Sequence, residues 1–411
     1  MVPGYARAVT IRAIYVHAPF CRRRCGYCDF AVTVASGADP GPWARLIALE
    51  LESVIEREGL RPPLRPATLY VGGGTPSLFG PYAMSALAEA LTPWVDFGGL
   101  AEWTAEANPE SFDGAVAQGW AAAGVNRLSL GAQTFHGPSL RWMGRLHGPE
   151  GPARALGHAR AAGIDNVSID LIFGLPDRLG RDWRADLDAA ERLRPEHLSL
   201  YGLTAEPGTP LHRRVAEGRE RLPGPDAYAS EYRLAAGRLA ARGWEHYEVS
   251  NFCRPGRASA HNEAYWDGSA YLGLGPGAHS YLPPHRRWNL RDWHAYRTAV
   301  EAGADATEET EAVDGPARAL ERIWLGLRTR SGIPVTPGPE RALVEGWVRE
   351  GLAEWIRPAA PERQATQAGA AGARLTHEGW LVMDRLALDL EAASRRAGRG
   401  AAASGAGRWP K

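Results

Sequence analysis

Cysteine is scarce in this chain, with four among 411 residues. A disulfide scaffold needs many cysteines spread along the sequence and an oxidising environment, so that class of protein is excluded. An excess of one charge is also missing, because Lys plus Arg and Asp plus Glu each total 47. Nothing global therefore favours a nucleic-acid or membrane-surface binder, and any electrostatic function must be local.

Long hydrophobic runs are absent as well. No apolar run reaches the roughly 18 residues that span a bilayer. Arg7 and Arg12 interrupt the start of the chain, where a signal peptide needs an unbroken apolar region. The sequence therefore predicts a cytoplasmic protein without a transmembrane segment, in which any membrane contact is peripheral and made through a partner. Its length and its hydrophobic content of 45% suit about two or three globular domains.

Three of the four cysteines are clustered in the stretch YVHAPFCRRRCGYCDF, as Cys21, Cys25 and Cys28. Clustered thiols in a reducing compartment indicate a metal site or catalysis. A structural zinc site takes four ligands, and His17 is a poor fourth ligand because it lies in an apolar, strand-like run. Three thiolates on one loop instead fit a 4Fe-4S cluster, in which each thiolate holds one iron and the fourth iron keeps an exchangeable ligand.

Three arginines, Arg22, Arg23 and Arg24, lie between the first two cysteines. We expect their charge to lower the pKa of the thiols and to offset the negative charge of a cluster. The alternative is a solvated basic turn that carries free thiols as small apolar side chains.

The segment 11–204 alternates short β-branched or apolar runs with longer runs of helical periodicity. Six runs are predicted to be strands: IRAIYVHAP, ATLYVGGG, EWTAEANP, NRLSLGAQTF, NVSIDLIFGLP and HLSLYGLTA. Each is followed by a helical stretch such as WARLIALELESVIEREG. Strands that alternate with helices predict a parallel sheet, closed or nearly closed into a barrel, with its chemistry at the carboxyl ends of the strands.

The unusual polar motifs of this half all fall at such strand ends. The cysteine loop follows the first predicted strand, GGGTP (72–76) the second and EANPE (106–110) the third. Gln133 follows the fourth strand and Asp170 lies on the fifth. We therefore expect these groups to meet at one end of the barrel.

This arrangement resembles the radical S-adenosylmethionine (SAM) enzymes, in which C-x3-C-x2-C follows the first strand and a GGGTP-like turn the second. More narrowly, YVHAPFC, YVGGGTPS, EANPES, SLGAQTF, GRLHG, SIDLIFGLPDR, EVSNFCRPG and HNEAYW are similar to the oxygen-independent coproporphyrinogen III oxidase family, and most to its heme-chaperone branch, HemW. The resemblance covers residues 11–390. It implies an α/β fold, a partial (β/α)6 radical SAM barrel followed by a small C-terminal winged-helix-like α+β domain.

The resemblance also implies the site residues. Cys21, Cys25 and Cys28 would hold the cluster, and SAM would chelate its open iron. The residues implied to contact SAM are Tyr15, Tyr27, Gly72, Gly73, Gly74, Thr75, Glu106, Gln133, Arg145 and Asp170. Glycines allow close approach, a guanidinium suits a carboxylate, and a carboxylate suits ribose hydroxyls. Taken singly, the glycine run is more often a flexible turn and each polar residue an ordinary hydrogen-bonded one, so the order of the motifs carries the prediction.

Two functions stay open from the resemblance. One is a heme chaperone that binds heme and passes it to an acceptor protein. The other is an oxidase that takes one electron from a donor, cleaves SAM to a radical and decarboxylates propionates of coproporphyrinogen III to vinyl groups. The chaperone is favoured because Phe30 stands where the oxidase has a further Cys, and because only fourteen residues precede Tyr15, where the oxidase has a long extension.

The motif HNEAYW (261–266) fits the H-N-x-x-Y-W signature of the chaperone branch. Imidazole is a common axial heme ligand and aromatic rings pack on a flat macrocycle, so we expect heme contact at His261. The alternative is a His-Asn pair that fixes a loop by hydrogen bonding. Cys253 could ligate the fourth iron, bind heme through its sulfur or be a small buried side chain. A fourth thiolate on the cluster would exclude SAM, and the family generally has a small residue such as Ala here, so the buried side chain is favoured.

The remaining sequence completes the expected organisation. Thr376 is a predicted helix cap. The C-terminal helices mix acidic residues with arginine, so no nucleic-acid face is expected. The expected segments are an N-terminal tail at 1–10, the barrel at 11–220, a barrel-capping segment with the HNxxYW loop at 221–300, the C-terminal domain at 301–390 and a disordered tail at 391–411.

Overall fold

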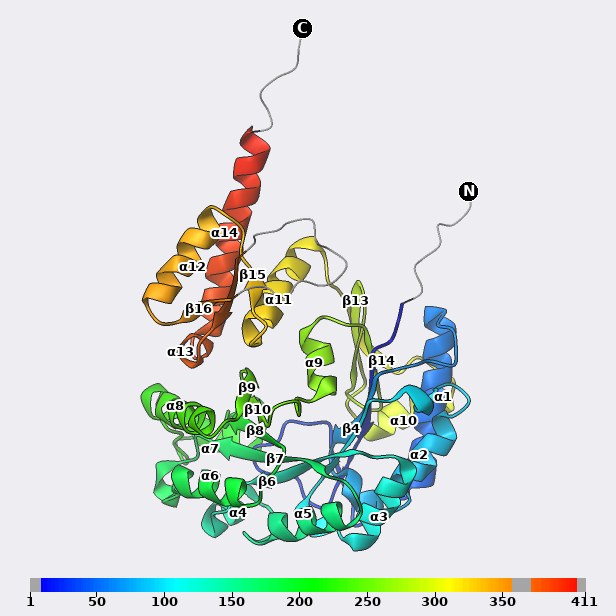
Figure 1. Ribbon diagram of the computed structural model, residues 1–411. Coiled ribbons are helices and arrows are strands. Elements are labelled where there is room, and N and C mark those ends of the chain that lie inside the picture. Colours follow the sequence, from blue (N-terminus) through cyan, green and yellow to red (C-terminus); the bar gives the residue numbers. More distant parts are fainter. Residues whose placement is uncertain (1–8, 357–370, 405–411) are drawn as a thin grey trace, which may run out of the picture. The chain divides into compact units, whose positions relative to one another are not determined.

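The computed structural model describes residues 9–356 and 371–404, and side chains up to residue 396 (Figure 1). It divides into two compact units. The first comprises Met1–Tyr232, Cys253–Tyr265 and Ser269–Ala312, and the second Arg233–Phe252, Trp266–Gly268 and Val313–Lys411. The expected capping segment at 221–300 is therefore divided between the two units.

All six predicted strands are present in the first unit, and each pairs with the next in parallel. Their order is β1 (Ala13–Ala18), β4 (Thr68–Gly73), β5 (Glu102–Ala107), β6 (Arg127–Gln133), β7 (Asn166–Phe173) and β8 (His197–Gly202). Their outward-facing side chains are almost entirely apolar and buried, which is typical of a sheet covered by helices. The predicted α/β architecture, with six parallel strands alternating with helices, is confirmed.

Helices connect these strands and lie around the outside of the sheet (Figure 1). They are α1 (Pro40–Glu58), α2 (Ala83–Leu91), α3 (Gly114–Ala123), α4 (Gly137–Met143), α5 (Gly151–Ala161), α6 (Trp183–Arg192) and α7 (Pro210–Ala216). Local signals set the bounds of α1: the Asp39 side chain accepts from the Gly41 N–H, and Gly59 ends the helix in a left-handed conformation with φ 61°. The Trp43 indole N–H of this helix donates to the His17 carbonyl of β1 at 3.1 Å, which joins the helix to the strand.

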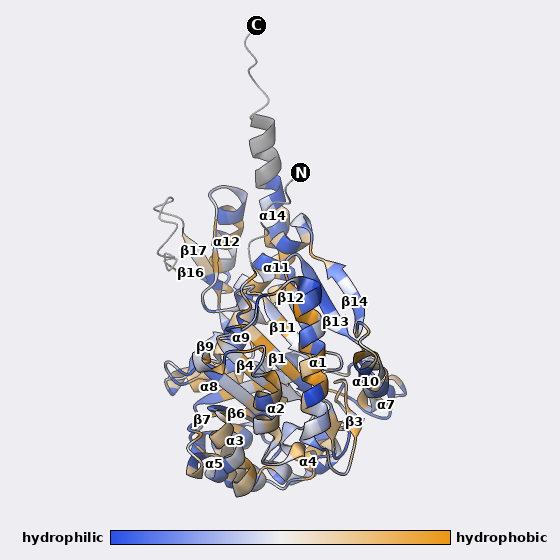
Figure 2. Ribbon diagram, turned by 90° about the vertical axis from the view of Figure 1, so that its right-hand side faces the viewer, coloured by the Kyte–Doolittle hydropathy of each residue, from blue (hydrophilic) through white to orange (hydrophobic). Residues whose placement is uncertain are grey.

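Residues after 270 extend the sheet beyond β1 instead of forming only turns. Strand β11 (Tyr271–Leu274) pairs in parallel with β1, and β12 (His279–Leu282), β13 (His285–Asn289) and β14 (Thr307–Ala312) follow antiparallel. Figure 2 shows β13 and β14 as hydrophilic strands. Helix α10 (Trp293–Glu301) connects them. The segment expected to cap the barrel therefore supplies three of the four strands that lie beyond β1, and β14 lies outside it.

The HNxxYW motif lies on a short helix, α9 (Ala260–Trp266), and the prediction of a loop is wrong. Two features start this helix. The Ser259 hydroxyl accepts from the Asn262 N–H at 3.3 Å, and the Glu102 carboxylate accepts from the N–H groups of Ala260 and His261 at 2.8 and 3.2 Å. An anionic group that accepts the unpaired N–H groups stabilises a helix N-terminus.

The second unit contains a three-stranded antiparallel sheet in the order β15 (Ile333–Pro334), β17 (Gly372–Leu375) and β16 (Ala353–Ile356). Its helices are α11 (Gly315–Arg328), α12 (Pro339–Arg349), α13 (His377–Trp380) and α14 (Met383–Ser404). Thr376 caps α13 by accepting from the Gly379 N–H, as predicted. The comparison of this α+β unit with a winged helix stays a prediction.

Three further elements lie near the points of the chain where one unit ends and the other begins. They are helix α8 (Pro225–Ala241), strand β9 (Glu245–Glu248) and strand β10 (Asn251–Cys253).

The prediction of disorder from residue 391 is wrong for 391–404, which continue α14. The buried face of Leu386 and Leu390 continues at helical spacing to the buried Ala393, so the start of this segment still has apolar surface to cover. The expected tails at 1–8 and 405–411 lie outside the described residues. Within residues 9–356 and 371–404, no helix is long and apolar enough to cross a membrane.

Candidate functional site

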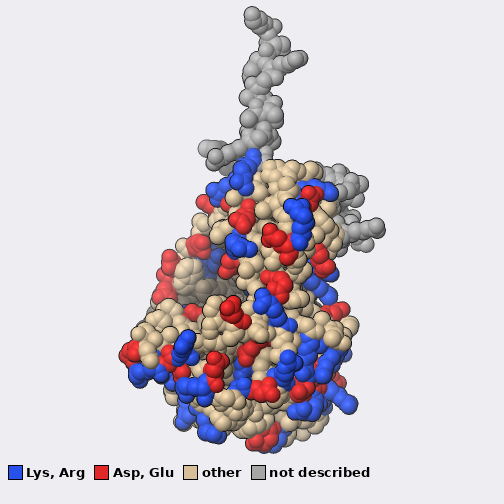
Figure 3. Space-filling model, turned by 90° about the vertical axis from the view of Figure 1, so that its left-hand side faces the viewer, with Lys and Arg blue, Asp and Glu red and all other residues tan. Residues whose placement is uncertain are grey.

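A cavity of about 420 Å3, here called the cysteine cavity, opens at the carboxyl ends of β4 to β8. It collects most of the predicted site residues on one surface. Those that line it are Cys21, Cys25, Tyr27, Cys28, Gly73, Gly74, Thr75, Glu106, Gln133, Arg145 and Asp170. Tyr15 and Gly72 do not line it. On the face of the protein shown in Figure 3, acidic and basic side chains are interspersed, so the charge in this cavity is a local feature.

The thiols of the cysteine loop are tied to two other loops of the barrel. The Thr75 hydroxyl, which follows β4, donates to Cys21 Sγ at 3.3 Å. Arg145 Nη1 lies 3.9 Å from Cys25 Sγ, within the range of a hydrogen bond to sulfur. The Cys28 N–H donates to the Cys25 carbonyl at 3.3 Å, which closes the turn between the last two cysteines. The fold therefore holds the cysteine loop against the strand ends.

The pKa of the thiols differs from the lowering that was expected from the three neighbouring arginines. Burial raises the pKa of Cys21 and raises that of Cys28 to about 11. Arg145 is the guanidinium that acts in the opposite direction on Cys21, because the three arginines 22–24 are exposed to solvent. The predicted lowering of the thiol pKa is therefore wrong for Cys21 and Cys28, while the expected offset of a cluster's charge by the arginines stays a prediction. A further cationic partner of the loop, Arg145, comes from the segment after α4.

The donor set fits an iron-sulfur cluster. Among the side chains that the structure describes, no three His, Cys, Asp or Glu converge to hold a single metal ion. A 4Fe-4S cluster makes a different demand, because each thiolate holds a separate iron and the ligands stand apart around the core. Three soft sulfur donors on one wall of a cavity, beside a half-buried guanidinium, meet that demand.

Glu106 is the carboxylate that organises the glycine loop. It accepts from the Tyr70 hydroxyl at 2.8 Å and from the Gly73 N–H at 2.9 Å. Burial raises its pKa to about 7 despite these two donors, and the charge of Asp170 adds to the rise. A Cβ atom on Gly72 would lie 2.6 Å from the Glu106 Oε1 atom, so glycine is required there by packing against this carboxylate.

The next glycine is required for a different reason. Gly73 has a φ of 101°, and a Cβ atom would lie 2.2 Å from the His17 ring. A Cβ atom on Gly74 would lie 2.5 Å from the Ala18 carbonyl oxygen. The glycine run therefore lets β4 pass close to β1, an internal role that the sequence interpretation, based on room for a ligand, did not include.

Arg145 is fixed by the ends of two strands. Its Nη2 donates to Asn108 Oδ1 at 2.6 Å and to the Gly131 carbonyl at 2.8 Å. Gln133 lies next to a register shift in β6 and has a φ of 66°, a left-handed conformation that is rare for a residue with a side chain. Such strain is concentrated at functional sites, where the surrounding structure holds it in place.

Asp170 faces the same cavity from β7. Ser129 donates to its Oδ2 atom at 2.9 Å and Ser168 to its Oδ1 atom at 3.1 Å. Burial raises its pKa, while these hydrogen bonds and the buried Arg127 guanidinium oppose the rise. The cavity therefore holds two half-buried carboxylates, Glu106 and Asp170, and one guanidinium that faces the thiols.

The sequence reasoning missed Tyr70, Asn108, Ser129 and Tyr201, which also line the cysteine cavity. The signal was present as strand alternation, because side chains at every second position share a face. Tyr70 precedes Gly72 by two positions, and Asn108 follows Glu106 by two. Counting by two from the recognised residues would have identified both.

Tyr15 lies in a second cavity of about 300 Å3, here called the aromatic cavity. It is lined by Tyr15, His17, Asp29, Phe30, Ala31, Tyr265, Tyr271, Gly277, Ala278, His279 and Arg291. The Tyr15 hydroxyl and His17 Nδ1 are 3.0 Å apart, and the Tyr15 ring stacks against Tyr70 with centroids 6.1 Å apart. The predicted contact between Tyr15 and SAM stays a prediction, since Tyr70 stands between this ring and the Glu106 carboxylate.

His261 lines neither cavity and is only 1% exposed. Its Nδ1 lies 2.8 Å from the Thr68 hydroxyl and its Nε2 3.0 Å from the Tyr265 hydroxyl, so both ring nitrogens are engaged within the first unit. Burial lowers its pKa to about 3. The ring is held by these two hydroxyls, whereas the alternative interpretation had paired it with Asn262.

Cys253 is fully buried, as expected of a small apolar side chain.

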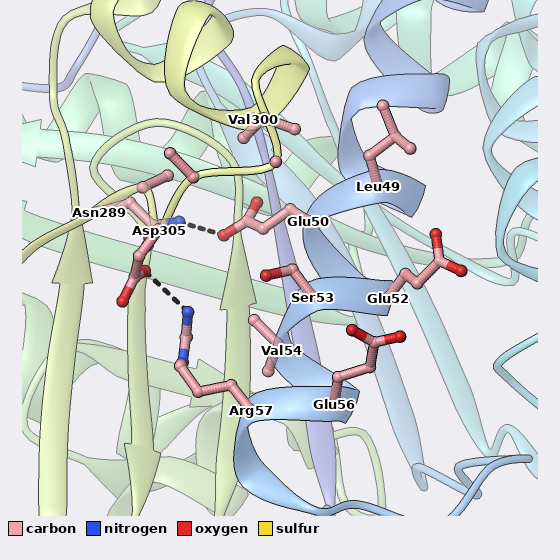
Figure 4. A pocket seen from close by; sticks show the side chains of 13 residues that line it. Leu49, Glu50, Glu52, Ser53, Val54, Glu56, Arg57, Asn289, Val300 and Asp305 are labelled. Atoms are coloured by element: carbon pink, nitrogen blue, oxygen red, sulfur yellow. Dashed lines mark hydrogen bonds and ion pairs between the residues drawn. The ribbon is translucent and has the colours of Figure 1, made fainter.

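A third cavity, of about 330 Å3, lies between α1 and residues 289–306 (Figure 4). Glu50 points into it and accepts from Asn289, from the Gly275 N–H at 2.7 Å and from the Tyr296 hydroxyl at 2.6 Å. Arg57 and Asp305 form an ion pair of 2.7 Å at its other side (Figure 4). None of the predicted site residues lines this cavity, and its contacts join α1 to the strands beyond β1.

Comparison with known proteins places this site in a family. Residues 15–190 match the radical SAM superfamily. "Heme chaperone HemW" of Mycobacterium tuberculosis (strain H37Rv) is 37% identical over 347 residues, which cover 83% of this chain and 88% of the relative. The protein of the same name from Bacillus subtilis is 30% identical over 376 residues, covering 90% and 97%. The chain belongs to the HemW family. This confirms the resemblance on which the sequence analysis relied.

A solved oxidase has a similar fold. Coproporphyrinogen III oxidase (HemN) of Escherichia coli superposes with a TM-score of 0.74 at 21% identity, covering 93% of this chain and 91% of that one. A radical SAM protein uses SAM and an iron-sulfur cluster, which together supply one-electron chemistry when bound. In this HemW family member, Cys21, Cys25 and Cys28 would hold the cluster, and the half-buried Arg145 and Asp170 side chains would orient a zwitterionic, ribose-bearing ligand beside it.

Proposed function

We propose that this protein is a heme chaperone, which binds heme and transfers it to an acceptor protein. It carries a 4Fe-4S cluster on Cys21, Cys25 and Cys28, with SAM as the exchangeable ligand of the fourth iron. The support comes from relatives named heme chaperones at 30–37% identity along most of the chain. Electrostatic fit adds to this support. The cysteine cavity offers the Arg145 guanidinium to the carboxylate of SAM and the Asp170 carboxylate to the ribose hydroxyls of SAM.

Phe30 is the observation that favours the chaperone over the oxidase. It is a large apolar side chain that is 53% exposed, and it lines both the cysteine cavity and the aromatic cavity. The oxidase motif has a cysteine at this position. A phenylalanine cannot supply a thiol there, and its exposed ring offers an apolar surface to a flat ligand instead.

The second candidate function is the oxidase itself. It is favoured by the similarity of the fold to a solved coproporphyrinogen III oxidase and by the SAM-directed residues that line the cysteine cavity, all of the predicted set except Tyr15 and Gly72. Both functions use the same cluster, so the presence of the cluster cannot separate them.

The experiment that separates them uses the full chain with its cluster reconstituted anaerobically. One sample receives SAM, reductant and coproporphyrinogen III, and mass spectrometry measures the loss of carboxyl groups. A second sample is titrated with ferric heme and then mixed with an apo heme protein, and the absorption of the acceptor is followed. We expect heme binding and transfer without decarboxylation. Multiple turnovers to protoporphyrinogen, together with no heme transfer, would establish the oxidase.

A further inference from the structure

His261 and His279 differ in whether a metal can reach a free nitrogen of the imidazole ring. The imidazole of His261 is buried and both its nitrogens are engaged. The imidazole of His279, at the start of β12, is exposed, and within the described part of the chain its ring makes no hydrogen bond. A neutral imidazole binds a metal through a nitrogen lone pair, which must be free and accessible. Only His279 meets both conditions without a rearrangement of the barrel.

The walls around His279 suit a flat apolar molecule. Tyr265 and Tyr271 pack edge to face at 4.6 Å, and the exposed ring of Phe30 stands at the rim. Gly277 and Ala278, which carry little or no side chain, line the same cavity and leave room for a planar ligand. Trp288 stacks on the far side of the His279 ring with centroids 5.5 Å apart, which limits its rotation.

Positive charge lies at the same cavity. Arg291 lines it and is exposed, and one of its Nη atoms donates to the Asp29 carbonyl, which orients the guanidinium. Arg286, on the neighbouring strand, is near enough to His279 to act on it electrostatically. Guanidinium groups bind carboxylates with directed hydrogen bonds, and a heme carries two propionate carboxylates at one edge.

We propose that the aromatic cavity is the heme-binding site and that His279 is an axial ligand of the heme iron, with Arg291 binding a propionate. This inference rests on the proposed chaperone function and names the site at which its ligand is held. At about 300 Å3 the cavity is at the small end for a small-molecule site. It therefore covers one part of the macrocycle and leaves the rest open, an arrangement that suits a carrier which must release its ligand.

The test is a ferric heme titration of the full chain, followed by the Soret absorption band. Four forms are compared: the unchanged protein, His279→Ala, His261→Ala and His285→Ala. His285 is the matched control, because it is an exposed imidazole on the same hairpin that does not line the aromatic cavity. We expect His279→Ala alone to shift the Soret band and to weaken heme binding about tenfold, or roughly 1.4 kcal/mol. Free imidazole added to this variant should restore the original band position.

Each other result has a distinct meaning. If the unchanged protein binds heme and His279→Ala gives the same band and affinity, the axial role of His279 is wrong and the chaperone function stands. If folded His261→Ala loses the band while His279→Ala keeps it, the ligand is His261 and the site is not the aromatic cavity. If the unchanged protein binds no heme at all, the proposed function fails together with the site. Circular dichroism of each variant establishes that it is folded.

Discussion

Glu102 on β5 accepts the backbone N–H of His261 on α9 at 3.2 Å, so one carboxylate fastens the HNxxYW helix to the barrel. The same side chain accepts from the Ala260 N–H at 2.8 Å and from the Ser259 hydroxyl at 3.0 Å. Glu102 is buried, and these donors lose their partner together if it is removed. The fixed orientation of His261 thus depends on a residue of the sheet.

Glu102→Ala should therefore destabilise the protein. Buried donors left without an acceptor cost about 1–3 kcal/mol in the free energy of unfolding, measured by chemical denaturation. Glu309→Ala, on the exposed strand β14, is the control and should stay within about 0.5 kcal/mol of the unchanged protein. Equal effects of the two substitutions would show that the contacts of Glu102 do not stabilise α9.

Replacing any one of Cys21, Cys25 and Cys28 by Ser should reduce the iron and sulfide content to near background after reconstitution, because a hydroxyl is a poor substitute for a thiolate iron ligand. Cys253→Ser is the matched control and should keep the full iron content, since that side chain is buried away from the cysteine cavity. Iron analysis and visible absorption measure the result. Loss of iron in the Cys253 variant would contradict the three-cysteine cluster.

Arg145→Lys should weaken SAM binding by about tenfold, or roughly 1.4 kcal/mol, while the cluster is retained. A lysine keeps the charge but lacks the planar guanidinium, whose Nη2 binds Asn108 and the Gly131 carbonyl while its Nη1 faces Cys25 Sγ. Equilibrium dialysis with SAM measures the affinity. Arg141→Lys, at an exposed position of α4, is the control. Unchanged SAM affinity in the Arg145 variant would remove this residue from the proposed site.

Stability should fall as pH rises through neutrality, with Glu50 as one cause. Burial raises its folded pKa from 4.5 to about 7, so the fold prefers the protonated carboxyl. Its stabilising contribution is therefore complete below pH 4.5 and is lost as pH rises through about 7, a change of about 3 kcal/mol at most.

Denaturation between pH 5 and 8 measures this slope, and Glu50→Gln should make it shallower because the amide does not titrate. The control is Glu56→Gln, an exposed position on the same helix, which should leave the slope unchanged. If Glu50→Gln retains the full slope, the pH dependence arises elsewhere, for example at Glu106, whose pKa is also raised to about 7 by burial.

Much of the site could be predicted because its residues lie at or near the ends of strands. The cysteine loop, Glu106 and Asp170 each follow or end a run with clear periodicity, and parallel strands bring such ends together. The family motifs added Arg145, whose position after α4 no strand pattern indicates.

The environment of His261 could not be predicted in the same way. Its Thr68 partner is 193 residues distant in the chain, and no local pattern reveals that α9 packs on the barrel. The pairing of β11 with β1 was missed for the same reason, because strands that pair across a long separation leave no trace in local periodicity. Helix α14 was cut short because the composition of its end outweighed the spacing of Leu390 and Ala393.

Asp29 and Phe30 line both the cysteine cavity and the aromatic cavity, so the two cavities share a wall. Two ligands bound on opposite sides of one wall cannot be thermodynamically independent if either of them moves it. Linkage then requires reciprocity: the factor by which SAM changes the affinity for heme equals the factor by which heme changes the affinity for SAM. The occupancy of the cluster site would in this way set how tightly the heme is held, and hence when it is released.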